Sequence, residues 1–159
     1  MYTGDWWHEE QQKIPTGSTL VPILFASDGT QLSTHAGDHE LWPLYMSVGN
    51  LPSSLRGKPS ANSWILIAVL PIPSKKDDHI EKDITTSIQV PRKATGEEQK
   101  KYQQFKDDVL HQVLDLVVAD LNQLREDGLA LECGDGIIRD GRPLLASWIA
   151  DYLEYNKLL

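Results

Sequence analysis

The feature that most restricts how this chain can fold is a stripe of apolar residues through residues 102–124. Its members recur at spacings of three and four: Tyr102, Phe105, Val109, Val113, Leu116, Val117, Leu121 and Leu124. This spacing predicts one long amphipathic helix. Thr95 and Glu98 have the pattern of a capping box at its start, and Gly128 suits the position just beyond its end. We expect the part of the stripe from Phe105 to Val117 to cover one face of a sheet.

Apolar runs on both sides of this helix predict the strands. Residues 19–26, 41–48 and 63–70 precede the helix, and residues 129–134 follow it. Three runs joined by loops indicate an antiparallel meander. Residues 142–155 begin with an Arg-Pro pair, and a proline in the first turn favours a terminal helix. The predicted order is three-stranded meander, long helix, fourth strand and terminal helix, which is an α/β domain.

The third run is apolar on both faces, as expected of a central strand covered on both sides. We therefore expect its middle residues to be buried: Leu66, Ile67, Ala68 and Val69.

Length and composition predict a single domain over residues 1–159. With 159 residues and 40% hydrophobic content, the chain can build one core. Residues 1–18 are a polar lead-in, and the charged, weakly apolar residues 74–94 are expected to form a flexible loop. The single Cys133 excludes an internal disulfide and a multi-cysteine zinc site, which favours an intracellular location. No apolar run reaches membrane-spanning length, so we expect no membrane association.

The charge balance restricts the partners of the chain. The formal net charge is −8 and the isoelectric point is about 5.0. Proteins that grip nucleic acid by neutralising phosphates carry the opposite sign on at least one face. By itself, the chain is therefore expected to bind DNA poorly.

Two Asp-Gly pairs lie at the ends of apolar runs, a little over a hundred residues apart. Asp28-Gly29 ends the first run, and Asp135-Gly136 follows the run after the long helix. Ligands of open α/β sheets bind at the carboxyl ends of strands. Two carboxylates that meet there suit Mg²⁺ or Mn²⁺. Both aspartates also fit ordinary turns, because Asp-Gly is a common turn dipeptide.

The predicted order of elements is the order in which the ribonuclease H-like fold begins. In that fold the first and fourth strands are parallel neighbours, and such neighbours need a long crossover, in this chain the helix. The carboxylates of Asp28 and Asp135 would then lie within roughly 8 Å of each other, close enough to hold one metal site.

A series of short motifs, in a constant order, resembles one protein family. The motifs are Trp6-Trp7, Ile14-Pro15-Thr16-Gly17, Ala26–Ser33, Trp42–Pro52, Leu55–Ser60, Leu66–Pro71, Cys133-Gly134-Asp135-Gly136 and Ala150-Asp151-Tyr152. Together they resemble the catalytic-domain segment of the Plavaka-type transposases of mushroom-forming fungi, distant relatives of the CACTA group.

The resemblance implies an incomplete ribonuclease H-like core of a DDE/D transposase. Asp28 and Asp135 match the first two acids of the catalytic triad, which would hold Mg²⁺ or Mn²⁺ for cleavage and transfer of DNA strands. In the family the third acid lies further along the chain, beyond the position that matches Leu159. We therefore expect this chain to be inactive alone, to bind metal weakly, and to meet DNA in the nucleus only as part of a full-length transposase.

Several alternatives stay open at this stage. The chain could be a non-catalytic interaction or regulatory module with a protein partner, for example one that joins full-length transposase. Glu154 could replace the missing acid, although a surface role is favoured. Arg139 and Arg142, near Asp135, are candidates for phosphate contacts. A loose cluster of His35, Asp38 and His39 could hold zinc, but a solvated loop is favoured.

Overall fold

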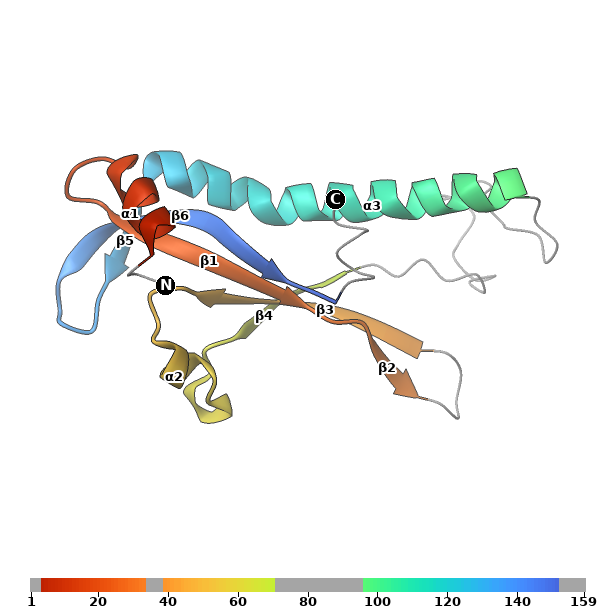
Figure 1. Ribbon diagram of the computed structural model, residues 1–159, viewed down its shortest axis with the longest axis horizontal. Coiled ribbons are helices and arrows are strands. Elements are labelled where there is room, and N and C mark those ends of the chain that lie inside the picture. Colours follow the sequence, from red (N-terminus) through yellow and green to blue (C-terminus); the bar gives the residue numbers. More distant parts are fainter. Residues whose placement is uncertain (1–3, 34–38, 71–95, 152–159) are drawn as a thin grey trace.

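The computed structural model describes residues 4–33, 39–70 and 96–151. Its elements are α1 (Asp5–Gln12), β1 (Thr19–Ser27), β2 (Thr30–Ser33), β3 (His39–Val48), α2 (Ser53–Arg56), a 3-10 turn (Pro59–Ala61), β4 (Ile65–Leu70), α3 (Gly96–Asp127), β5 (Leu129–Glu132) and β6 (Ile138–Ile149). Together they form a mixed α/β structure in which α3 runs along one face of the sheet (Figure 1). The Thr95 cap, the predicted loop 74–94, His35, Asp38 and Glu154 lie outside the described residues.

The sheet has six strands in the order β2-β3-β1-β6-β5, with β4 also paired to β3. β1, β3 and β4 form an antiparallel meander, as the sequence predicts. β6 pairs with β1 in parallel, whereas β5 pairs with β6 in an antiparallel hairpin. Parallel neighbours cannot be joined by a tight turn, and α3 is the long connection that crosses from the meander to β6.

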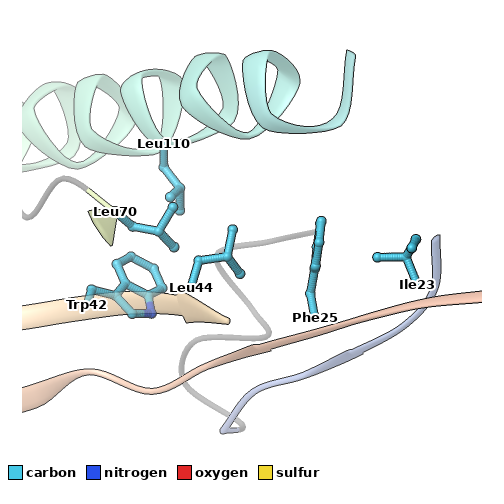
Figure 2. Packing of buried hydrophobic residues seen from close by; sticks show 6 residues of the cluster. All are labelled: Ile23, Phe25, Trp42, Leu44, Leu70 and Leu110. Atoms are coloured by element: carbon cyan, nitrogen blue, oxygen red, sulfur yellow. The ribbon is translucent and has the colours of Figure 1, made fainter. Parts of the chain in front are cut away.

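The core lies between the sheet and α3. Figure 2 shows Ile23 and Phe25 of β1 and Leu44 of β3 pointing toward the helix, from which Leu110 points back. Phe25 and Leu44 are fully buried, and the Phe25 ring meets the Trp148 ring edge to face, with centroids 5.2 Å apart. These side chains from β1, β3, β6 and α3 hold the sheet and the helix together through one apolar cluster.

Only part of the predicted stripe of α3 faces the core, and Leu116, one of its members, is 74% exposed. Val113 and Val117 pack against the core, together with Leu114, Val118 and Leu121, while Phe105 and Val109 are half-buried and lie outside the core cluster. A helix has 3.6 residues per turn, so each step of four residues advances about 40° around it. A stripe made only of such steps winds around the helix, and the sheet meets its later part.

The prediction that β4 is a buried central strand is wrong. Leu66 and Val69 are each 51% exposed, and Ile67 is 37% exposed. Within the described residues β4 pairs with β3 alone, so it forms an edge of the sheet. Its continuous apolar pattern does not distinguish a covered strand from an edge strand with apolar faces.

The prediction of a terminal helix over residues 142–155 is also wrong, because the chain continues in β6 as far as Ile149. The Arg-Pro pair lies inside this strand, where Pro143 aligns with Val21 of β1. Proline lacks a backbone donor and is tolerated in strands that have an unpaired side. β5 pairs with β6 only as far as Gly141, so Pro143 lies where that second partner has ended.

Candidate functional site

The carboxyl ends of β1 and β6 lie together because these strands are parallel neighbours. Their last aligned pair is Ala26 with Ile149. Asp28 and Asp151 each follow two residues later, and both are exposed. Counted on from this pair, Asp28 corresponds to Asp151, and both acids follow the carboxyl ends of neighbouring strands, which in a sheet lie about 4.8 Å apart.

Asp135 lies at the other end of the sheet, in the turn between β5 and β6. The start of β1 lies at this same end of the sheet, where Thr19 aligns with Gly141. From Thr19 to Ser27 the strand advances eight residues, a distance of roughly 26 Å. The expectation that Asp28 and Asp135 converge is therefore not met. The reason is that the strand after the helix, β5, is a hairpin partner of β6 and not the neighbour of β1.

The side chain of Asp135 is used within its own hairpin. Its carboxylate accepts two hydrogen bonds from Arg139, at 2.9 and 2.7 Å, and one from the backbone N–H of Ile137, at 3.1 Å. Gly136 takes a positive φ of 75° at the turn. This is the behaviour of a turn former, the alternative that the Asp-Gly dipeptide left open. A cation at this carboxylate would have to displace the guanidinium group of Arg139.

The Asp135–Arg139 pair predicts an acid-sensitive hairpin. The hydrogen bonds from Arg139, followed by the one from Ile137, lower the pKa of Asp135 from 3.8 to about 2. Because the folded-state pKa lies below the ordinary one, the pair stabilises the hairpin above about pH 4, and this contribution is lost as the pH falls toward 2. An NMR titration of the carboxyl carbon is expected to show a midpoint near 2 that moves toward 3.8 in Arg139→Gln. An unchanged midpoint in that variant would contradict the assignment.

Arg142 is also used structurally, at the same end of the sheet as Asp135. Its guanidinium group binds the Asp140 carboxylate at 2.9 Å and donates to the carbonyls of Arg125, at 3.0 Å, and of Glu126, at the end of α3. Ser18 donates to the same Asp140 oxygen, Oδ2, and its hydroxyl, followed by Arg142, lowers the pKa of Asp140. Arg139 and Arg142 therefore hold elements together at this end, far from Asp28.

The lead-in segment fastens the start of β1. The side chain of Gln11 on α1 donates to the carbonyl of Ser18 and accepts from the backbone N–H of Leu20, both at 2.9 Å. Glu10 of the same helix pairs with Arg125 of α3 at 3.3 Å. Residues 5–12 thus belong to the folded structure and link β1 to α3.

The oxygens near Asp28 suit a hard cation but do not complete a site. Among the described residues, no hydrogen-bond or ion-pair partner contacts the Asp28 carboxylate. Within the same part of the chain, no group of three or more His, Cys, Asp or Glu side chains is placed to hold a metal. Asp28 is therefore an exposed carboxylate at the end of β1, and within the described residues it is not part of a complete metal site.

Asp151, and not Asp135, follows the strand that lies beside β1. From the sequence alone, Asp151 is identified only as part of the motif Ala150-Asp151-Tyr152. The signal that could have found it is Gly134-Asp135-Gly136, which lies between two apolar segments and is typical of a hairpin turn. If this segment is interpreted as a hairpin turn, the strand beside β1 is the second strand of the hairpin, and that strand ends before Asp151 and not before Asp135.

Comparison with known proteins identifies the family. No curated protein and no solved structure matches the chain. No helix in the described part of the chain is both long and apolar enough to cross a membrane. The family model described as Plavaka transposase matches residues 1–158, which is essentially the whole chain. The chain therefore belongs to the Plavaka transposase family.

Proposed function

We propose that this chain carries part of a transposase core for metal-dependent cleavage and transfer of DNA strands, with Asp28 and Asp151 as its first two carboxylates. The observation that carries the proposal is the parallel register of β1 and β6, which aligns Ala26 with Ile149 just before the two acids. Membership of the Plavaka transposase family supports a transposon-derived function.

The topology supports a ribonuclease H-like core. A meander of β1, β3 and β4 is followed by a crossover helix and by a strand parallel to β1. The ribonuclease H-like fold begins in this way, with its first and fourth strands side by side. β6, and not β5, takes the place of the fourth strand, and the hairpin with β5 is an addition at its start. The acid at the end of the fourth strand is then Asp151.

The chemistry requires more than two acids. Mg²⁺ or Mn²⁺, when held by carboxylates, would supply activation of a water or a 3′-hydroxyl and stabilisation of the leaving oxygen of a phosphodiester. The exposed carboxylate of Asp28 and the acid at position 151 would hold such ions at the carboxyl ends of β1 and β6. A third carboxylate is needed to complete the site, and Glu154, outside the described residues, stays the first candidate within the chain.

The charge of the chain favours DNA binding only as part of a larger assembly. A net charge of −8 repels phosphates, and Arg139 and Arg142 are engaged in contacts at the far end of the sheet. Other parts of a full-length transposase would therefore supply the neutralising cations.

Titration with Mn²⁺ tests the acid pair. Asp28→Asn and Asp151→Asn are each expected to weaken Mn²⁺ binding at least tenfold, the order of loss seen when even an outer-shell partner of a metal ligand is removed. Asp135→Asn is the matched control, and it is expected to leave the affinity unchanged because Asp135 lies at the other end of the sheet. Equal weakening by all three variants, or by Asp135→Asn alone, would overturn the proposal.

A further inference from the structure

A change of register separates the two halves of the β1–β6 pairing. Ile23 aligns with Leu145, but the next residue of β1, Leu24, aligns with Ser147. Ala146 is thus an extra residue in β6, as in a β-bulge. Only the shifted register aligns Asp28 with Asp151. Without the bulge, Asp28 would align with Ala150, and the acid at 151 would lie one residue further along.

The shifted register is short. After the bulge, three aligned pairs remain, from Leu24 with Ser147 to Ala26 with Ile149. A slip of one residue moves a strand by about 3.3 Å and turns each side chain to the opposite face. Ligand oxygens lie about 2.0–2.6 Å from Mg²⁺ or Ca²⁺, so one such slip is enough to take a carboxylate out of a shared site.

One side-chain hydrogen bond crosses the two strands beyond the bulge. The indole N–H of Trp148 donates to the hydroxyl of Ser27 at 3.0 Å. Ser27 directly precedes Asp28 and is only 5% exposed. The Trp148 ring is held edge-on against Phe25 at an interplanar angle of 83°, which fixes the direction of its N–H group. A slip in register would leave this donor without its acceptor in a part-buried position, which costs free energy.

We propose that Ser27 and Trp148 are positioning residues that lock the bulged register and thereby align Asp28 with Asp151. This inference rests on the proposed function of the acid pair. Neither residue contacts the metal in this proposal: Ser27 acts through the end of β1, and Trp148 acts through the end of β6.

Two substitutions remove the bond from either side. Ser27→Ala removes the acceptor, and Trp148→Phe removes the donor while keeping an aromatic ring against Phe25. Each is expected to weaken Mn²⁺ binding about threefold to tenfold, at or below the low end of the roughly 10–100-fold losses known for groups that orient metal ligands directly. The double variant is expected to bind Mn²⁺ no more weakly than either single variant, because the two substitutions remove the same hydrogen bond. Ser27→Thr keeps the hydroxyl and is expected to restore binding.

Ser47→Ala is the matched control. Ser47 is another buried serine, 3% exposed, on β3 where it aligns with Leu24. It lies outside the β1–β6 pair, so its loss is expected to leave Mn²⁺ affinity unchanged. A purely structural role for Ser27 and Trp148 would lower stability while leaving the affinity of the folded protein intact.

A measurement without metal keeps this inference separate from the proposed function. Cross-strand nuclear Overhauser contacts report the register, and in the unmodified chain they are expected to join Ala26 to Ile149. In Ser27→Ala and Trp148→Phe a second set is expected, which joins Ala26 to residue 148. If Mn²⁺ binding does not depend on Asp28, the proposed function fails, and the contacts still decide the register lock. If both variants keep the single register and full Mn²⁺ affinity, the positioning role is overturned.

Discussion

Replacement of Phe25 by alanine is expected to lower the free energy of unfolding by about 3–5 kcal/mol, the usual cost of removing a fully buried phenylalanine. Phe25 is 0% exposed and lies where β1, β6 and α3 meet. Its loss also removes the edge-to-face partner of Trp148. Chemical denaturation with a fitted slope measures the change.

Phe105→Ala is the matched control for Phe25→Ala. The sequence stripe predicts that Phe105 covers the sheet, but this side chain is only half-buried and lies outside the core cluster. Phe105→Ala is expected to lower the free energy of unfolding by roughly 1–2 kcal/mol, because the Phe105 side chain buries a smaller apolar area than Phe25 does. Equal losses for the two variants would show that the first turns of α3 dock on the sheet as firmly as the later ones.

Gly128→Ala is expected to lower the free energy of unfolding by about 2–4 kcal/mol, because two separate effects add. Gly128 ends α3 with φ at 83°, a conformation that disfavours any side chain. A methyl group there would also collide with the Asp140 carboxylate and would lie 2.9 Å from the Arg142 guanidinium carbon. The substitution therefore strains the backbone and disturbs the ion pair that binds the end of the helix.

Gly17→Ala separates these two effects. Gly17 has a similar φ of 93°, but a methyl group there would meet nothing within 4 Å. Gly17→Ala is expected to lower the free energy of unfolding by about 1–2 kcal/mol, from backbone strain alone. If chemical denaturation gives the same loss for both glycines, the close approach of Asp140 and Arg142 to the helix end carries no energetic weight.

The elements that depend on local pattern could be predicted from the sequence. The helix α3 is predictable because its periodicity of 3.6 is strong and local, and the meander is predictable because its apolar runs are separated by loops. β6 was missed because an Arg-Pro pair resembles a helix start, while the evidence for a strand lies in β1. The aligned partner of Pro143 is Val21, more than a hundred residues away, and no local pattern reports it.

Of the two acids expected at the ends of neighbouring strands, Asp28 and Asp135, the structure places only Asp28 at such an end. Asp28 follows a strand that is evident from its own sequence, and the structure leaves it at the exposed end of that strand. The choice between Asp135 and Asp151 depended on which of two successive strands pairs with β1. That choice is made by the packing of β6 against α3 and by the hairpin turn around Asp135, a turn that the sequence analysis did not interpret as joining two strands. Whether Asp28 and Asp151 bind metal stays a prediction.

The bond between Ser27 and Trp148 joins residues 121 positions apart in the chain. Contacts of such separation form late in folding, because the entropy of closing a long loop is lost before the contact stabilises anything. The meander and the α3–β5–β6 segment can each form from nearby residues, and each then carries one acid of the proposed pair. In the proposed function the two acids become a pair only when these halves dock, so a partly folded chain would hold both residues apart from each other.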